Sequence, residues 1–183
     1  IIILLIMFLF VFIGIFFGKI LDEKSKQEIE KFKQRLNSLG ILEHNEITHI
    51  YGHPYIGTNT NVFLVINNDN NLYFYKTWND VISKTNEISK IPINQVTRYE
   101  LKTESEIQKD VTLARLLVLG VFAFGAKKKT EINNSYLVLS YVQNNVSIDC
   151  VFKNSTNNQQ LGNIISTLNR LKIEQNSIES QTI

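Results

Sequence analysis

Three histidines within ten residues are the densest group of side chains that could bind a metal or move a proton. They are His44, His49 and His53, in the segment HNEITHIYGH. A zinc protease needs two histidines four positions apart on one helix, with a glutamate between them. His44 and His49 are five positions apart, and the β-branched residues around them favour an extended chain. On a strand His49 and His53 would share one face, which leaves a weak metal site as an alternative. The pattern favours histidines at the surface or at a sheet edge, so no metal site is predicted.

The sequence carries no other recognisable catalytic signature. It has neither a G-x-S-x-G nucleophile motif nor a glycine-rich loop that would cradle a phosphate. Carboxylates paired for hydrolysis are also missing, because the candidate aspartates stand alone. These are Asp69, Asp80, Asp110 and Asp149. We therefore expect a protein that is not an enzyme and that needs no cofactor.

The single cysteine, Cys150, lies in the segment VSIDCVF. Val146, Ile148, Cys150 and Phe152 would face one way along a strand there. The pattern predicts a core residue and not a reactive thiol, because no nearby histidine or helix start would lower its pKa. Without a second cysteine the chain forms no internal disulfide, which suits a reducing compartment.

The charged residues argue against one class of partner and for another. They make up 20% of the 183 residues and give a formal net charge of only +2, so nucleic acid is not predicted as a partner. Lys127, Lys128 and Lys129 follow an apolar run that carries Arg115. Clustered cations beside an anionic leaflet gain about 1 kcal/mol each. These four residues are the predicted contacts with a membrane surface, and the alternative is a solvated turn after a buried segment.

The apolar run at residues 111–126, VTLARLLVLGVFAFGA, is the longest outside the N-terminus. Its sixteen residues are fewer than the roughly 20 that cross a bilayer, and Arg115 would cost about 2.5–3.5 kcal/mol near the centre. A crossing would also strand the three following lysines on the outer face. We therefore expect no second span. The run is either an interfacial segment or a buried element, and we expect it to pack on the sheet and present the lysines at the surface.

Residues 1–21 are predicted to form a transmembrane anchor. The first 17 residues, IIILLIMFLFVFIGIFF, carry no charge, and about 20 helical residues span a hydrocarbon layer of roughly 30 Å. The following segment FFGKILDEKSK has no small-residue cleavage pattern, which argues against a signal peptide. Basic residues crowd the end of the anchor and the positions that follow it, so the positive-inside rule predicts a single-pass protein with its body in the cytoplasm. These residues are Lys19, Lys24, Lys26, Lys31, Lys33 and Arg35.

Residues 22–40 are predicted to form a juxtamembrane helix that ends at Gly40. The acidic residues come early and Arg35 comes late, which is the order that the helix dipole favours. A thin apolar stripe follows helical spacing, but it is shorter than the three heptads of a coiled coil. A spacer helix is therefore favoured over a dimerising stalk. The stripe consists of Ile29, Phe32, Leu36 and Leu39.

From residue 41 onwards the apolar pattern becomes that of short strands. Two of them, at residues 61–66 and 72–76, flank an Asn/Asp cluster that is typical of a hairpin turn. The polar stretch at residues 79–90 is predicted to be a loop. A C-terminal amphipathic helix follows from apolar residues at helical spacing, and residues 174–183 are predicted to be a disordered tail. The other predicted strands are 47–55, 91–101, 135–141 and 146–152, and the helix residues are Leu161, Ile164, Ile165, Leu168 and Leu171.

The order of these elements resembles that of a bacterial pleckstrin-homology-like (PH-like) domain. The resemblance lies in ISKIPINQVTRYEL, SYLVLSY, VSIDCVF and QLGNIISTLNRL, and it covers residues 47–172. It implies an α+β fold at residues 41–173, in which an antiparallel sheet bends into a half-barrel and the C-terminal helix closes one end. It also implies binding of protein or lipid and no catalysis.

Together these features predict a membrane-anchored, non-enzymatic binding or scaffolding module on the cytoplasmic face. Its expected partners are the lipid bilayer and a protein. The alternative is an extracytoplasmic or secreted structural domain with a truncated signal sequence.

Overall fold

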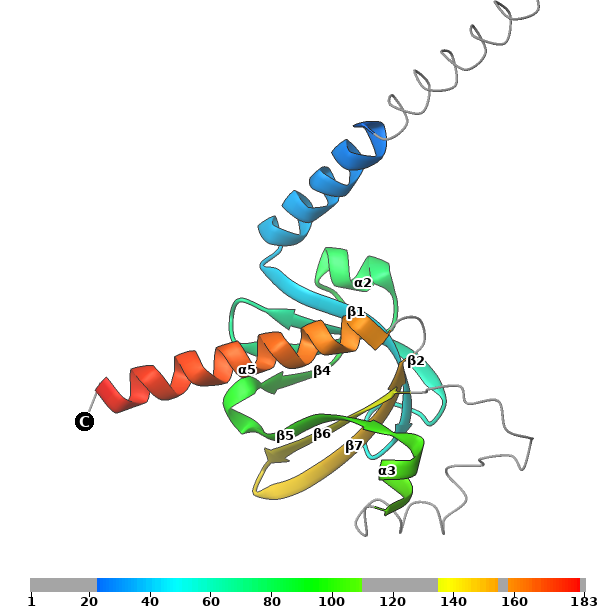
Figure 1. Ribbon diagram of the computed structural model, residues 1–183, viewed down its shortest axis with the longest axis vertical. Coiled ribbons are helices and arrows are strands. Elements are labelled where there is room, and N and C mark those ends of the chain that lie inside the picture. Colours follow the sequence, from blue (N-terminus) through cyan, green and yellow to red (C-terminus); the bar gives the residue numbers. More distant parts are fainter. Residues whose placement is uncertain (1–22, 110–134, 155–157, 182–183) are drawn as a thin grey trace, which may run out of the picture. The chain divides into compact units, whose positions relative to one another are not determined.

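The computed structural model describes residues 23–109, 135–154 and 158–181 (Figure 1). The chain divides into two compact units, residues 1–40 and 41–183. The predicted anchor at 1–21 and the apolar run at 111–126 lie outside the described residues. Among the helices that are described, none combines the length and the apolar character needed to cross a bilayer.

The first unit contains a helix at residues 23–38, within the range predicted for the juxtamembrane helix. The backbone N–H of Gly40 donates to the carbonyl of Asn37 at 2.9 Å. Gly40 has φ +73°, a left-handed conformation that glycine adopts without a Cβ penalty. Gly40 therefore ends the helix as predicted.

The second unit is built on a seven-stranded antiparallel sheet (Figure 1). Its strand order is β4-β3-β2-β1-β7-β6-β5, so the edge strands β4 and β5 are consecutive in sequence. The strands are β1 (Ile41–Tyr51), β2 (Thr60–Asn67), β3 (Asn71–Tyr75), β4 (Glu87–Pro92), β5 (Val96–Thr103), β6 (Ser135–Gln143) and β7 (Val146–Asn154). The sheet is open, and the short 3-10 helix η1 (Ile93–Gln95) joins its two edges along the chain.

Asparagines make the tight turns of two hairpins. The β2–β3 hairpin turns at the predicted Asn/Asp cluster, where Asn70 has φ +60°. The β6–β7 hairpin turns at Asn144 and Asn145, with φ +51° and +62°. Two consecutive positive φ angles are those of a type I′ turn, whose twist matches that of the flanking strands. Both hairpins were predicted, and the cross-strand pairing confirms them.

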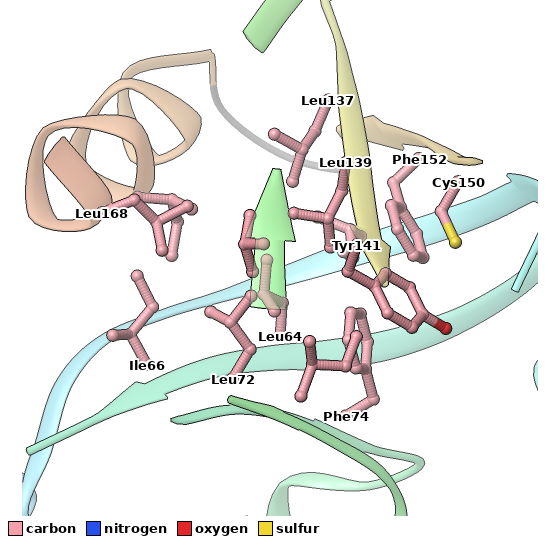
Figure 2. Packing of buried hydrophobic residues seen from close by; sticks show 14 of the residues in the cluster. Leu64, Ile66, Leu72, Phe74, Leu137, Leu139, Tyr141, Cys150, Phe152 and Leu168 are labelled. Atoms are coloured by element: carbon pink, nitrogen blue, oxygen red, sulfur yellow. The ribbon is translucent and has the colours of Figure 1, made fainter. Parts of the chain in front are cut away.

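The hydrophobic core lies on one face of the sheet. Alternate residues of β2, β3, β6 and β7 point into it, as the period of two requires. Figure 2 shows Leu72 and Phe74 facing Leu139 and Phe152 across this core. Burying each such side chain contributes roughly 1.5–3 kcal/mol. Cys150 belongs to the same core, which confirms its predicted position.

Helix α5 (Asn158–Gln181) packs against β1, β5 and η1. Its apolar stripe is buried, which confirms the predicted amphipathic helix. Two polar bonds fix the helix at its margin: Tyr99 Oη donates to Asn169 Oδ1 at 2.8 Å, and Lys172 Nζ donates to the carbonyl of Asn94 at 3.4 Å. The buried stripe consists of Leu161, Ile164, Leu168 and Leu171.

The helix continues beyond the predicted end at residue 173. It reaches Gln181, where a disordered tail was expected. Arg170 pairs with Glu174 at 3.2 Å one turn further on, which supports the helix across the predicted boundary. No glycine or proline follows Gly162 to interrupt it.

The predicted loop at residues 79–90 is instead largely ordered. Helix α2 (Trp78–Ser83) occupies its first part and β4 its last. Thr77 and Asp80 form a capping box, and Lys84 ends the helix in the left-handed conformation with φ +53°. The loop prediction was wrong because these short elements are stabilised by burying Val81 and Ile91, which a polar local composition does not reveal.

A second, smaller apolar cluster lies on the outer face of the sheet. Val138 of β6 and Val151 of β7 form its centre, and Ile107 of α3 (Glu104–Lys109) covers it. The fold is therefore α+β: an open seven-stranded antiparallel sheet with short accessory helices and a long C-terminal helix.

Candidate functional site

The loop between β1 and β2, residues 52–59, brings together two of the three histidines. The other predicted site residues, Arg115 and Lys127–Lys129, lie outside the described part of the chain, so their membrane contact stays a prediction. His44 takes no part in the loop, since it lies on the outer face of β1 with its ring 4.8 Å from that of Trp78.

Gly52 allows the backbone of the loop to pack closely against the neighbouring strand β7. The β1–β7 pairing shifts its register between His49 and Tyr51, so β1 ends in a bulge. Gly52 follows with φ +96°, and a Cβ placed there would overlap the carbonyl oxygen of Asp149. Only glycine allows this approach, because it lacks the atom that would collide. The backbone of the loop therefore rests directly on β7.

The ring of His49 links the two ends of the loop. Its Nδ1 lies 3.0 Å from the carbonyl oxygen of Gly57, and its Nε2 lies 3.0 Å from the backbone nitrogen of His53. A carbonyl only accepts and a backbone N–H only donates. His49 must therefore carry its proton on Nδ1 and accept at Nε2.

His53 is held in the opposite tautomer. Its Nδ1 accepts from the backbone N–H of Tyr55 at 3.2 Å, so its proton is on Nε2. The side chain is only 4% exposed, and the ring lies 5.1 Å from that of Phe74. Burial, reinforced by the nearby His49, lowers the pKa of His53 from its ordinary 6.5 to about 4. His53 is therefore neutral at physiological pH.

These hydrogen bonds leave neither histidine a lone pair for a metal. Metal-bound histidine coordinates through an unprotonated ring nitrogen, and here each such nitrogen accepts a backbone N–H. Within residues 23–109, 135–154 and 158–181, no three His, Cys, Asp or Glu side chains are grouped to hold an ion. The expectation of surface or edge histidines was wrong for His49 and His53, which are both buried. Their shared role is to shape the loop.

Two further polar groups lie beneath the loop. Tyr141 of β6 is buried, with its ring 6.3 Å from that of His53, and Cys150 of β7 is buried beside it (Figure 2). Burial, with the nearby charge of Asp149, raises the pKa of Cys150 to about 12. Burial also raises the pKa of Tyr141 above its usual value. Both groups are therefore protonated at neutral pH.

The polar atoms beneath the loop are incompletely paired. Within the described residues, neither His53 Nε2 nor the Tyr141 hydroxyl has a partner with hydrogen-bond geometry. The hydroxyl of Tyr141 and the thiol of Cys150 do influence each other's ionisation, so the two groups are close. Buried donors without a good acceptor cost free energy, which makes this end of the core less stable than an apolar one.

A separate surface feature is the aromatic patch, formed by His44, Phe63 and Trp78. It lies on the outer face of β1 and β2, where the first residue of α2, Trp78, packs on the rings of His44 and Phe63 at 4.8 Å and 5.5 Å. The three ring side chains are half-buried. The patch therefore joins α2 to the outer face of the sheet.

Sequence reasoning missed both features for the same reason. The buried histidines depend on the contact of Gly52 with Asp149, and the patch depends on α2 folding back onto β2. The available signal for the first was a glycine between two histidines directly after a strand.

Comparisons with protein-family models, with curated proteins and with solved structures find no match, so function must be inferred from these residues.

Proposed function

We propose that this protein is a membrane-anchored, non-enzymatic binding module whose β-rich domain lies on the cytoplasmic face and contacts a partner protein. The uncharged run at residues 1–17 and the lysines that follow it support the anchor and the orientation. The lysine triplet at residues 127–129, with Arg115, is the proposed contact with the lipid surface.

The strand order supports a PH-like half-barrel as the framework of the module. Edge strands β4 and β5 are joined by the three residues of η1, and α5 packs against β1, β5 and η1. A sheet whose two edges are linked in this way, with its opening covered by the last helix, is the arrangement that the sequence resemblance implies.

The aromatic patch carries the proposal of a protein partner. Tryptophan and phenylalanine supply large contact areas at a low entropic cost, and such aromatics are enriched at the centre of protein interfaces. Glu46 lies directly opposite Phe63 in the β1–β2 pairing, so a carboxylate borders the patch. An anionic leaflet would repel this carboxylate, whereas a protein can pair with it. The patch therefore suits a protein better than a membrane.

The titratable groups beneath the loop support a non-enzymatic role. A general acid or base works best with a pKa near the operating pH. The pKa of His53 falls to about 4 and that of Cys150 rises to about 12, so both are displaced from neutrality in opposite directions. Neither is suited to proton transfer or to nucleophilic attack at physiological pH.

Site-specific photo-crosslinking tests the binding surface. A photoreactive phenylalanine derivative replaces Phe63 in the patch or, as a matched control, Val146, an apolar residue 59% exposed at the β6–β7 turn. We expect a discrete protein adduct in membranes from position 63 and none from position 146. Equal adducts from both positions, or adducts from neither, would contradict a partner on the patch.

Paired reporters at the C-terminus test the orientation. A cytoplasmic reporter should be active and an extracytoplasmic reporter silent. Activity only outside would overturn the cytoplasmic placement and support an extracytoplasmic domain in its place.

A further inference from the structure

We propose that the β1–β2 loop is an acid-released latch, which holds Tyr141 and Cys150 covered at neutral pH and uncovers them when His53 takes up a proton. The proposal concerns a second property of the domain and does not depend on the partner surface proposed above.

The bonding of the His53 ring makes the latch sensitive to protons. Its Nε2 already carries hydrogen, and its Nδ1 accepts the backbone N–H of Tyr55 at 3.2 Å. A second proton can only enter at Nδ1, where it would place a ring N–H against the backbone N–H of Tyr55. Protonation of His53 therefore breaks one of the hydrogen bonds that shape the loop.

Burial and the nearby His49 disfavour a positive charge on His53. The titratable groups whose rings face it are His49 of β1, Tyr55 of the loop and Tyr141 of β6, and Cys150 of β7 lies beside Tyr141. Among the described residues no carboxylate acts on His53 to offset its charge. Asp149 presents its backbone carbonyl to the loop at Gly52. The cost of burying a charged His53 ring is removed only when the ring moves outward into water.

The loop covers the groups that its release would uncover. The ring of His53 lies 6.3 Å from that of Tyr141, and the Tyr141 hydroxyl lies close to the Cys150 thiol. The ring of Tyr55 lies 6.0 Å from that of His53, and Tyr55 is close enough to affect the ionisation of Tyr141. Cys150, which lies beside Tyr141 in the core, is 0% exposed.

The base of the loop can hold while the rest opens. The backbone N–H of Asn59 donates to the carbonyl of His49 at 2.7 Å, a bond without a titratable partner. Gly52 and Asn59 flank the moving segment, and both have left-handed φ angles, of +96° and +57°. The structure thus contains a closed base, two residues that can act as pivots, and one proton-sensitive contact between them, from the Tyr55 N–H to His53 Nδ1.

Two residues that occur once in the chain make the opening measurable. Cys150 is the only cysteine and lies under the latch, and Trp78 is the only tryptophan and lies on the outer face in α2. The full 183-residue chain in detergent is treated with a dithiodipyridine reagent between about pH 7 and pH 4. Each labelling rate is divided by that of the chain unfolded in denaturant at the same pH. This ratio removes the intrinsic pH dependence of thiol and reagent.

The expected result is a relative labelling rate about twentyfold higher at about pH 5 than at about pH 7. Trp78 emission is followed in His44→Gln, which lacks the imidazole beside the indole, and should stay unchanged over this range. A flat labelling ratio would overturn the proposal. So would a rise in labelling of His44→Gln that only follows a loss of its Trp78 signal, because that describes global unfolding.

Three variants separate the latch from a general acid effect. His53→Asn keeps an acceptor near the Nδ1 position but cannot be protonated, so labelling should stay slow and lose most of its acid response. His53→Ala lacks the acceptor and should label faster at neutral pH. His44→Gln removes the histidine outside the loop and should keep the wild-type labelling profile. An undiminished acid response in His53→Asn would contradict the latch.

Hydrogen exchange tests the latch in the wild-type chain, so the result does not depend on whether a variant folds. Relative to intrinsic rates at each pH, the amides of His53 and Tyr55 should lose protection in acid while the amide of Asn59 keeps it. Simultaneous loss at all three amides would overturn local opening.

Discussion

The two ends of the core are held by different kinds of interaction. Leucine and isoleucine side chains of α5 pack into the core on one side. Beneath the β1–β2 loop, histidine rings, a tyrosine and a cysteine occupy comparable depth. Apolar packing is insensitive to pH and has no preferred direction, whereas the loop depends on individual hydrogen bonds with fixed tautomers. The packing of α5 should therefore supply most of the folding stability, and the loop should supply most of the dependence of that stability on pH.

The largest effect should come from truncating the packing of α5. Leu168→Ala removes a fully buried side chain and should cost about 2–5 kcal/mol of unfolding free energy. Ile173→Ala, five residues later and 67% exposed, should change it by less than about 0.5 kcal/mol. Urea unfolding of both variants gives the two values. Equal losses would show that the helix does not derive its stability from the buried stripe.

Acid should weaken the loop and not the helix. The pKa of His53 is about 4 in the folded protein and 6.5 ordinarily, so the folded state disfavours its protonation. The stabilisation from neutral His53 is complete above about pH 6.5 and is lost as the pH falls towards 4, a loss of about 3 kcal/mol. Urea midpoints measured across this window should fall in the wild type. Much of that fall should disappear in His53→Asn. An equal fall of the urea midpoint in the wild type and in this variant would show that groups other than His53 cause it.

Glycine-to-alanine substitutions should have opposite signs in the two regions. Gly52→Ala places a Cβ against the Asp149 carbonyl at a left-handed φ and should destabilise by about 2 kcal/mol or more. Gly162→Ala lies in α5 with no atom within 4 Å of the new Cβ, and should stabilise by about 0.5–1 kcal/mol. Thermal unfolding midpoints distinguish the two. Stabilisation by Gly52→Ala would show that the loop does not rest on β7.

The smallest contrast concerns two tyrosine hydroxyls. Tyr99→Phe removes a hydrogen bond to Asn169 at the helix and should cost about 0.5–1.5 kcal/mol. Tyr141→Phe removes a buried hydroxyl that has no well-formed hydrogen bond, and should be neutral or slightly stabilising. A substantial loss in Tyr141→Phe, measured by urea unfolding, would indicate that its contact with Cys150 is a strong bond.

The fold was largely predictable where short-range periodicity decides structure. Alternation in SYLVLSY and VSIDCVF predicted β6 and β7, the asparagine clusters predicted the hairpins, and the spacing from Leu161 to Leu171 predicted the buried face of α5. α2 and β4 were missed because burial of Val81 and Ile91, and not local propensity, decides their structure. The end of α5 was misplaced because its last turns bury little and carry no stop signal.

The candidate site was much less predictable than the fold. His49 and His53 looked like exposed polar residues, since nothing local reveals that Gly52 will rest on a strand about a hundred residues later. The tautomers follow from hydrogen bonds with Gly57, His53 and Tyr55, which exist only once the loop has closed. A sequence can reveal a motif for catalysis, but it does not reveal histidines whose hydrogen bonds shape the backbone of a loop.

The central position of β1 has a consequence for how the chain folds as it is made. β1 pairs with β2, which follows within a few residues, and with β7, so that Asn45 meets Asn154 across 109 positions. The first four strands can join while β7 is still unsynthesised, which leaves one edge of β1 open to other chains. Pairing at such long range makes closure of the sheet slow. Nascent chains should therefore be most prone to aggregation between the emergence of β4 and that of β7.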